Sequence, residues 1–76
     1  MRELVEFITK SLVDEPAAVR VTQVDGEHAV VLEVRVAALD MGKVIGKQGR
    51  IARALRAVVK AAAVRAGKRV MVEIVQ

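Results

Sequence analysis

The stretch GKVIGKQGR, residues 42–50, combines three glycines with three basic side chains. The segments on either side look helical, and a glycine inside a helix costs about 1 kcal/mol relative to alanine. Glycine at 46 and at 49 removes the Cβ atoms that would hold a sugar-phosphate chain away from the backbone. Lys47 and Arg50 add positive charge, and backbone amides at the start of a following helix favour an anion. These residue types predict contact with a chain of phosphates.

Other interpretations of this stretch fit less well. A phosphate-binding P-loop requires G-x-x-x-x-G-K-[ST], but only three residues separate Gly42 from Gly46, and Gln48 stands where the magnesium-binding hydroxyl belongs. A dinucleotide-binding loop, G-x-G-x-x-G, requires a glycine two residues before Gly46, where the chain has Val44. A plain turn joining two helices needs only one glycine. That last interpretation stays open.

Charge is divided unevenly along the chain. Residues 1–40 carry a net charge of −4, whereas residues 41–76 carry +8 and contain Glu73 as their single acid. Positive potential concentrated on one part of a small fold favours a polyanion such as nucleic acid. A solvated basic face that only confers solubility is the alternative at this point.

The residues needed for catalysis are missing. The chain has no cysteine and a single histidine, His28, beside a predicted turn. Its carboxylate pairs, Glu3 with Glu6 and Asp14 with Glu15, are explained by helix ends and solubility. Nucleophilic, metal-assisted and acid–base schemes therefore lack their groups, and we expect neither an enzyme nor a cofactor. No signal peptide or membrane span is visible, so a cytoplasmic location is expected.

Apolar periodicity predicts three helices and three strands. Pro16 is expected to end the first helix, Asp40 to cap the short second helix, and Gly67 to stop the third. Asp25-Gly26 signals a hairpin, because both residue types tolerate positive φ. The predicted elements are a helix over residues 2–14, strands over 18–24 and 29–37, helices over 41–45 and 50–66, and a strand over 69–75.

The apolar faces of these elements define an expected core. Arg53, Arg56 and Lys60 fall on a separate arc of the third helix that faces solvent. The residues expected to face the core are Leu4, Val5, Phe7, Ile8 and Leu12 in the first helix, Val19, Val21, Val30, Leu32, Val34 and Val36 in the first two strands, Ile51, Leu55, Val58, Val59 and Ala62 in the third helix, and Val70, Val72 and Ile74 in the last strand.

Connections between the elements limit the topology. A hairpin makes the first two strands antiparallel, and a crossover through two helices places the last strand parallel to the second. The expected fold class is therefore α+β in the order α-β-β-α-α-β, with a three-stranded mixed sheet and helices packed on one face. A chain of 76 residues has room for one domain, residues 1–76.

Gly46-Lys47-Gln48-Gly49 resembles the GXXG loop of KH domains, and its context VIGKQG is typical of them. The element order looks like the type II KH arrangement. From Leu4 to Ile74 the chain resembles small bacterial single-KH RNA-binding proteins of the KhpA type, through SLVD, VLEVRVA, GKVIGKQGR and AGKRV. The sequence AALDMG departs modestly from these relatives, many of which carry a proline and an extra acid there.

The resemblance implies a narrow groove that binds about four nucleotides of single-stranded RNA. The glycines would allow close approach, Lys47 and Gln48 would meet phosphates or sugars, and Val34 or Val36 would help line the apolar side. It also implies a homodimer, or a heterodimer with a Jag-type KH protein. The candidate RNA-binding residues are Lys43, Val44, Ile45, Gly46, Lys47, Gln48, Gly49, Arg50, Ile51 and Arg53.

The chain has one aromatic residue, Phe7, so base stacking on rings cannot supply affinity. We therefore expect weak, modestly selective and salt-dependent RNA binding by an RNA chaperone or post-transcriptional regulator. Two alternatives stay open: a protein-interaction or dimerisation module with an incidental basic face, and a DNA-binding module resembling a helix-turn-helix.

Overall fold

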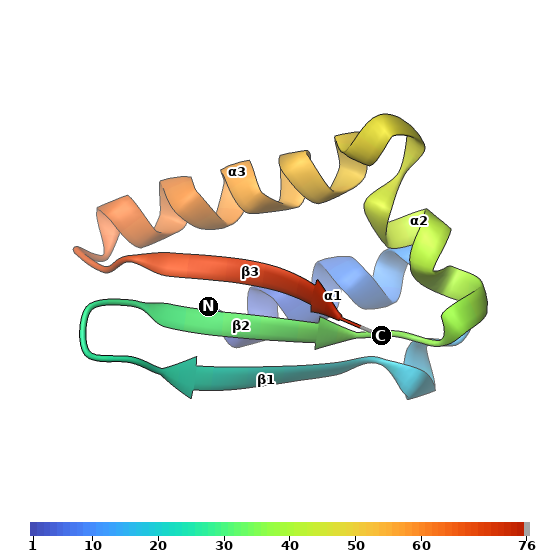
Figure 1. The fold of residues 1–76 in the computed structure, drawn as a ribbon, viewed down its shortest axis with the longest axis horizontal. Coiled ribbons are helices and arrows are strands. Elements are labelled where there is room, and N and C mark those ends of the chain that lie inside the picture. The colour runs from blue at the N-terminus through green and yellow to red at the C-terminus, as the bar shows by residue number, and fades with distance from the viewer. Residues whose placement is uncertain (76) are drawn as a thin grey trace.

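The computed structural model describes residues 1–75 (Figure 1). Three short 3₁₀ turns occur between the main elements of the described chain, and the last of them connects α2 to α3. The elements are α1 (Arg2–Leu12), η1 (Pro16–Ala18), β1 (Arg20–Asp25), β2 (Val30–Arg35), η2 (Ala38–Asp40), α2 (Met41–Ile45), η3 (Lys47–Gly49), α3 (Arg50–Arg65) and β3 (Val70–Val75). The predicted order of helices and strands is confirmed.

The three strands form one mixed sheet in the order β1-β2-β3. β1 pairs antiparallel with β2, with Val21 opposite Val34. β2 pairs parallel with β3, with Leu32 beside Val72. The chain passes from β2 to β3 through α2 and α3, as a parallel pair requires. The predicted α+β class and the mixed sheet are therefore confirmed.

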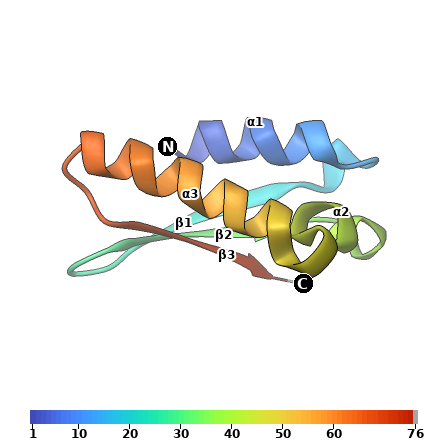
Figure 2. The same ribbon diagram turned by 90° about the horizontal axis from the view of Figure 1, so that it is seen from above.

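The helices lie on one face of the sheet (Figure 2). α1 crosses behind β2, while α3 runs alongside β3, which is an edge strand (Figure 1). α2 and the loop that follows it lie at the end of the sheet where β2 finishes (Figure 1). This arrangement places the first turn of α3 and the GKQG loop at the same end of the molecule.

The core lies between the sheet and the two long helices. Leu32 and Val34 of β2 are completely buried at its centre, as the alternating pattern predicts. The suggestion that Val34 lines a ligand groove is therefore wrong, and Val36 is packed against the same core. The buried cluster consists of Val5, Val19, Val21, Leu32, Val34, Leu55, Val59 and Val72.

α1 presents a different face to the sheet from the one expected. Val5 and Thr9 are its buried residues, whereas the side chain of Phe7 is 71% exposed. Thr9 can be buried because its hydroxyl donates to the carbonyl of Val5 at 2.8 Å. The burial predicted for Phe7 is wrong, since two residues along a helix from Val5 point about 200° away.

α3 packs on the sheet through smaller residues than predicted. Leu55 and Val59 are buried as expected, but they are accompanied by Ala52 and Ala63, whereas Val58 is 47% exposed. Alanine lets a helix approach the sheet closely, so the contact face centres on the 52–55–59–63 row. The core position predicted for Val58 is therefore wrong.

Two predicted turn signals have different outcomes. Gly67 has φ 70° and ends α3, with the amide of Lys68 donating to the carbonyl of Ala63 at 2.9 Å, so the left-handed stop is confirmed. The hairpin at Asp25-Gly26 forms, but neither residue has positive φ. The Gly26 amide instead donates to the carbonyl of Ala29 at 2.8 Å and closes a longer loop.

The ends of α1 and β1 also differ from the prediction. α1 finishes at Leu12, and Val13 is already extended with φ −100° and ψ 160°. Pro16 does not end this helix but starts the 3₁₀ turn η1, where its fixed φ suits the first position. The backbone amides of Asp14 and Glu15 are held instead by Asp40, as described below.

Candidate nucleic-acid interface

The GKQG loop is a tight turn between two helices. Gly46 ends α2 with φ 77° and ψ 172°, a backbone region that only glycine adopts readily. Gln48 (φ 57°) and Gly49 (φ 74°) follow in the left-handed region, and α3 starts at Arg50. Two glycines are therefore needed by the backbone itself, and Gln48 carries local strain between them.

The two glycines face different surroundings. A Cβ atom on Gly46 would lie 2.6 Å from Cγ1 of Ile51, so Gly46 is required by internal packing. A Cβ atom on Gly49 would meet nothing within 4 Å. The idea that both glycines leave room for a bound strand therefore fits Gly49 alone.

Backbone amides at the loop are partly used by the turn itself. The amide of Gly49 donates to the carbonyl of Gly46 at 3.1 Å, and the amide of Arg50 donates to that of Lys47. Of the amides at the start of α3 that were expected to favour an anion, that of Arg50 is therefore already used within the chain. The first turn of α3 has no acidic residue and no side-chain cap. No carboxylate in that turn therefore offsets the partial positive charge at the N-terminus of the helix.

The side chains of the loop reach solvent. The side chains of Lys47, Gln48 and Arg50 are exposed and, within residues 1–75, make no hydrogen bond or ion pair. Ile45 is also exposed and Ile51 is half-buried, so these two apolar side chains border the loop. Val44 is the completely buried residue of α2, so its side chain is not accessible to a ligand.

Asp40 is the buried acid that fixes α2. It is 1% exposed, and its carboxylate accepts from the amide of Asp14 at 3.2 Å and that of Glu15 at 3.0 Å. Burial on its own raises the pKa of Asp40, but these two donors and the Lys43 ammonium outweigh it and hold the pKa below its usual value. The predicted capping of α2 by the Asp40 side chain is wrong, because the carboxylate binds the segment after α1.

Lys43 belongs to the same cluster. Its ammonium pairs with Asp14 and lies 3.5 Å from Asp40. The hydrogen bond to Asp14 raises the pKa of Lys43, and the charge of Asp40 acts in the same direction. Of the basic residues predicted for the site, Lys43 thus already forms ion pairs with two carboxylates of the chain.

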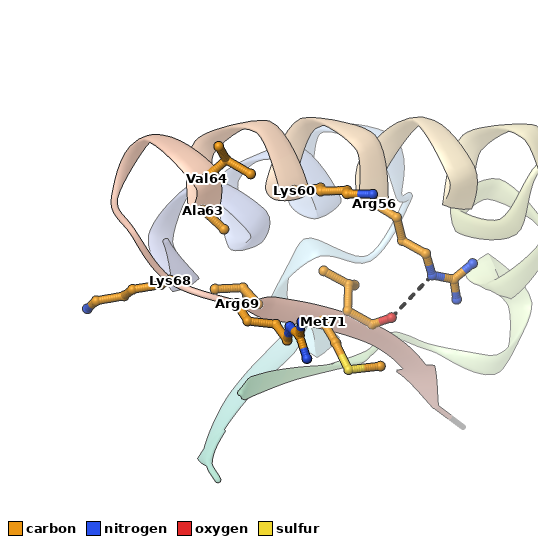
Figure 3. Close-up of a pocket in the computed structure, with 9 residues that line it drawn as sticks. Arg56, Lys60, Ala63, Val64, Lys68, Arg69 and Met71 are labelled. Atoms are coloured by element: carbon orange, nitrogen blue, oxygen red, sulfur yellow. Dashed lines mark hydrogen bonds between the residues drawn. The ribbon is translucent and has the colours of Figure 1, made fainter. Parts of the chain in front are cut away.

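A groove lies between α3 and β3 (Figure 3). It has a volume of about 580 Å³ and an apolar floor bordered by positive charge. Arg56 reaches across it from α3, and its Nε donates to the carbonyl of Val72 on β3 at 3.2 Å. Its basic residues are Arg56, Lys60, Lys68 and Arg69, and its apolar residues are Ala63, Val64, Val70, Met71 and Val72.

One row of cations joins this groove to the GKQG loop. Arg53, Arg56 and Lys60 follow one another at three- or four-residue spacing, so they share one side of α3. Arg50 precedes them in the first turn, where it also borders the space between α1 and α3. Arg53 is exposed between the loop and the groove, as predicted. Sequence reasoning placed Arg56 and Lys60 on the solvent arc but assigned no role to Lys68 and Arg69. Their position beside the same groove requires the packing of α3 on β3, which periodicity does not reveal.

Two other kinds of feature are absent from residues 1–75. No helix there is both long and apolar enough to cross a membrane. No group of three or more potential metal ligands among histidine, cysteine and the acids occurs in this part of the chain. The candidate interface consists of the loop, the cation row and the groove.

Comparison with known proteins agrees with this geometry. The family model described as KhpA/KhpB, KH domain matches residues 2–74. The chain is 61% identical over 75 residues to RNA-binding protein KhpA of Clostridium perfringens, covering 99% of this chain and 100% of that protein. It is 51% identical over 76 residues to RNA-binding protein KhpA of Aquifex aeolicus, covering 100% of this chain and 96% of that protein. No solved structure matches the chain.

The family match includes both the GKQG loop and the groove between α3 and β3. The sheet order and the helix–loop–helix connection seen here are those implied by the resemblance to KH domains. The family is non-enzymatic, in keeping with the absence of catalytic groups from the sequence. The chain belongs to the KhpA/KhpB family of KH-domain proteins.

Proposed function

We propose that this single KH domain, residues 1–76, binds about four nucleotides of single-stranded RNA along the GKQG loop and the groove between α3 and β3. The observation that carries the proposal is the unbroken row of cations on α3, which leads from the loop into the groove. The relatives KhpA of Clostridium perfringens and of Aquifex aeolicus are both named RNA-binding proteins. That name supports RNA as the polyanion.

The loop would hold the RNA backbone. Lys47 and Arg50 are exposed and have no acidic partner within residues 1–75, so they are available to phosphates. The open space at Gly49 allows a ribose-phosphate chain to approach the main chain there. Gln48 can donate to a phosphate or a 2′-hydroxyl through its amide nitrogen.

The groove would hold the bases. Its apolar floor suits the faces of unpaired bases, whereas a duplex keeps those faces stacked inside and presents only edges. Because the groove has no aromatic residue, affinity must come from phosphates, base edges and contact with aliphatic side chains. We expect weak, salt-dependent binding with modest selectivity, which suits an RNA chaperone or a post-transcriptional regulator acting in the cytoplasm.

A second surface favours assembly with another KH domain. A hollow of about 320 Å³ between α1 and α3 is lined almost entirely by apolar side chains, including Ile8, Leu12 and Val58. Phe7 and Leu4 are exposed on α1. Contiguous exposed apolar residues of this kind mark interaction sites. A homodimer, or a heterodimer with a Jag-type KH protein, would cover them and raise RNA affinity by joining two sites.

The loop provides the test of RNA binding. The double variant Lys47→Asp/Gln48→Asp reverses the charge at the loop, and aspartate tolerates the left-handed backbone at position 48. We expect at least a tenfold loss of affinity for an unstructured oligoribonucleotide, with thermal unfolding nearly unchanged. The matched control, Lys10→Asp/Ser11→Asp at exposed positions of α1, lowers the net charge by the same amount away from the loop and should retain binding.

Competition separates the remaining alternatives. Unlabelled single-stranded RNA should displace the labelled oligonucleotide more readily than duplex DNA does, and the reverse order would favour a DNA-binding module. If the double loop variant is folded and binds RNA as tightly as the parent protein, the loop is not the site. Self-association without any RNA binding would favour a protein-interaction module.

A further inference from the structure

One edge of the Arg56 guanidinium is held in place within the groove by a hydrogen bond. Its Nε donates to the carbonyl oxygen of Val72 at 3.2 Å, so the side chain is held between α3 and the edge strand β3 (Figure 3). The terminal nitrogens Nη1 and Nη2 have no partner within residues 1–75. Arg56 therefore presents a planar pair of N–H donors in a set position, with less rotamer freedom left to lose on binding.

Such a fork distinguishes bases by their edges. Two parallel N–H donors match two adjacent acceptors, as arginine matches N7 and O6 of guanine. Cytosine also offers adjacent acceptors, O2 and N3, on its pairing edge. Adenine and uracil alternate acceptors with N–H donors on their pairing edges, so one arm of the fork would face a donor. A fixed arginine is thus selective in a way that a mobile lysine is not.

We propose that Arg56, anchored on Val72, makes one nucleotide position in the groove selective for guanine or cytosine over adenine and uracil. The inference rests on the proposed function, because it requires that the groove accept bases. Arg53 and Lys60 have no anchor of this kind and serve as phosphate contacts without base preference.

The test compares the affinities of RNA octamers that differ in base composition. Fluorescence anisotropy at low salt and pH 7 would measure the affinity of the full chain for oligocytidine, oligouridine and oligoadenosine, and for oligouridine with one central guanosine. Oligocytidine and the guanosine-containing octamer should bind at least about fivefold tighter than oligouridine and oligoadenosine. Arg56→Lys keeps the charge and removes the fork, so the cytidine-to-uridine ratio should fall to about one. Arg65→Lys makes the same exchange at an exposed position of α3 outside the groove lining and should keep the ratio.

The outcomes separate the two proposals. Equal affinity of the parent protein for all four octamers, or an unchanged ratio in Arg56→Lys, overturns the role of Arg56 and leaves RNA binding intact. Binding of none of the octamers overturns both. If Arg56→Lys does not fold, the Nε–H resonance of Arg56 in the parent protein decides. It should shift with oligocytidine and not with oligouridine, and equal shifts or none would overturn the selectivity.

Discussion

The place where a Cβ atom on Gly46 would stand lies 2.6 Å from Cγ1 of Ile51, the second residue of α3. The two helices on either side of the GKQG loop therefore meet through a glycine and the side chain that covers it. Gly46 also has φ 77° and ψ 172°, a backbone conformation that residues with a Cβ atom rarely adopt. The close approach of α2 and α3 at this point thus requires glycine at position 46.

Replacing this glycine should be costly. Gly46→Ala should lower the free energy of unfolding by about 2–3 kcal/mol, because it combines backbone strain with a clash. Gly49→Ala, with φ 74° and open space, should lose only about 1 kcal/mol. Urea unfolding followed by circular dichroism measures both. Equal losses would show that the contact with Ile51 does not matter.

The clash can be tested separately. Ile51→Ala removes two of the three side-chain atoms nearest that position, Cγ1 and Cδ1. The double variant Gly46→Ala/Ile51→Ala should therefore lose less stability than the two single variants together, by about 1 kcal/mol. Simple additivity of the two losses would contradict the geometry at this contact.

Asp40 should make stability depend on acid pH. Its pKa is lowered in the folded protein from an ordinary value of 3.8, so its stabilising contribution is present above that value and is lost as pH falls through the lowered pKa. Asp40→Asn should lower the melting temperature at pH 7, and the gap to the parent protein should shrink below about pH 4. A gap that stays constant down to pH 2 would contradict the assigned contacts with Asp14 and Glu15.

Lys43 and Lys47 should contribute differently to RNA affinity. Lys47 is without an acidic partner in the described chain, whereas Lys43 pairs with Asp14 and Asp40. Lys47→Met should weaken binding and reduce the slope of log K against log salt by about 0.7, the value for one phosphate contact with a single strand. Lys43→Met should change this slope much less. A larger change for Lys43 would place the RNA on the α2 side of the loop.

Substitution of Val5 should lower the stability of the fold, whereas substitution of Phe7 should affect self-association instead. Val5→Ala should destabilise the fold by about 2 kcal/mol, because it removes methyl groups from a fully buried site. Phe7→Ser should change stability by less than about 0.5 kcal/mol, since the ring is exposed. Sedimentation at increasing protein concentration tests its other role, because Phe7→Ser should weaken any self-association. Unaltered assembly in this variant would exclude the α1 surface.

The sequence allowed the fold to be predicted more fully than the site. Alternation in VLEVRV has a period of two, so Leu32 and Val34 could be assigned to the same face of their strand, which is the core face in the structure. The helices were harder, because their apolar residues cover a wide arc. The choice between Phe7 and Thr9, or between Val58 and Ala63, depends on the angle at which each helix meets the sheet.

The loop residues were identified by type, but their partners were not. Nothing in the pattern distinguishes an exposed Lys47 from a Lys43 held by Asp14, which lies 29 positions away in the chain. The buried role of Asp40 was hidden for the same reason, since a capping acid before a helix gives an identical signal. The groove depends on the contact of Arg56 with Val72, 16 residues further on, and only the folded chain brings them together.

The most direct test of the account is an NMR titration of the full chain with a short unstructured oligoribonucleotide. The account predicts that amide resonances of residues 43–53 shift together with those of Arg56 and Val72, while those of α1 and β1 stay in place. Resonances of the loop and the groove that remain unmoved while the RNA binds elsewhere, or does not bind, would contradict it.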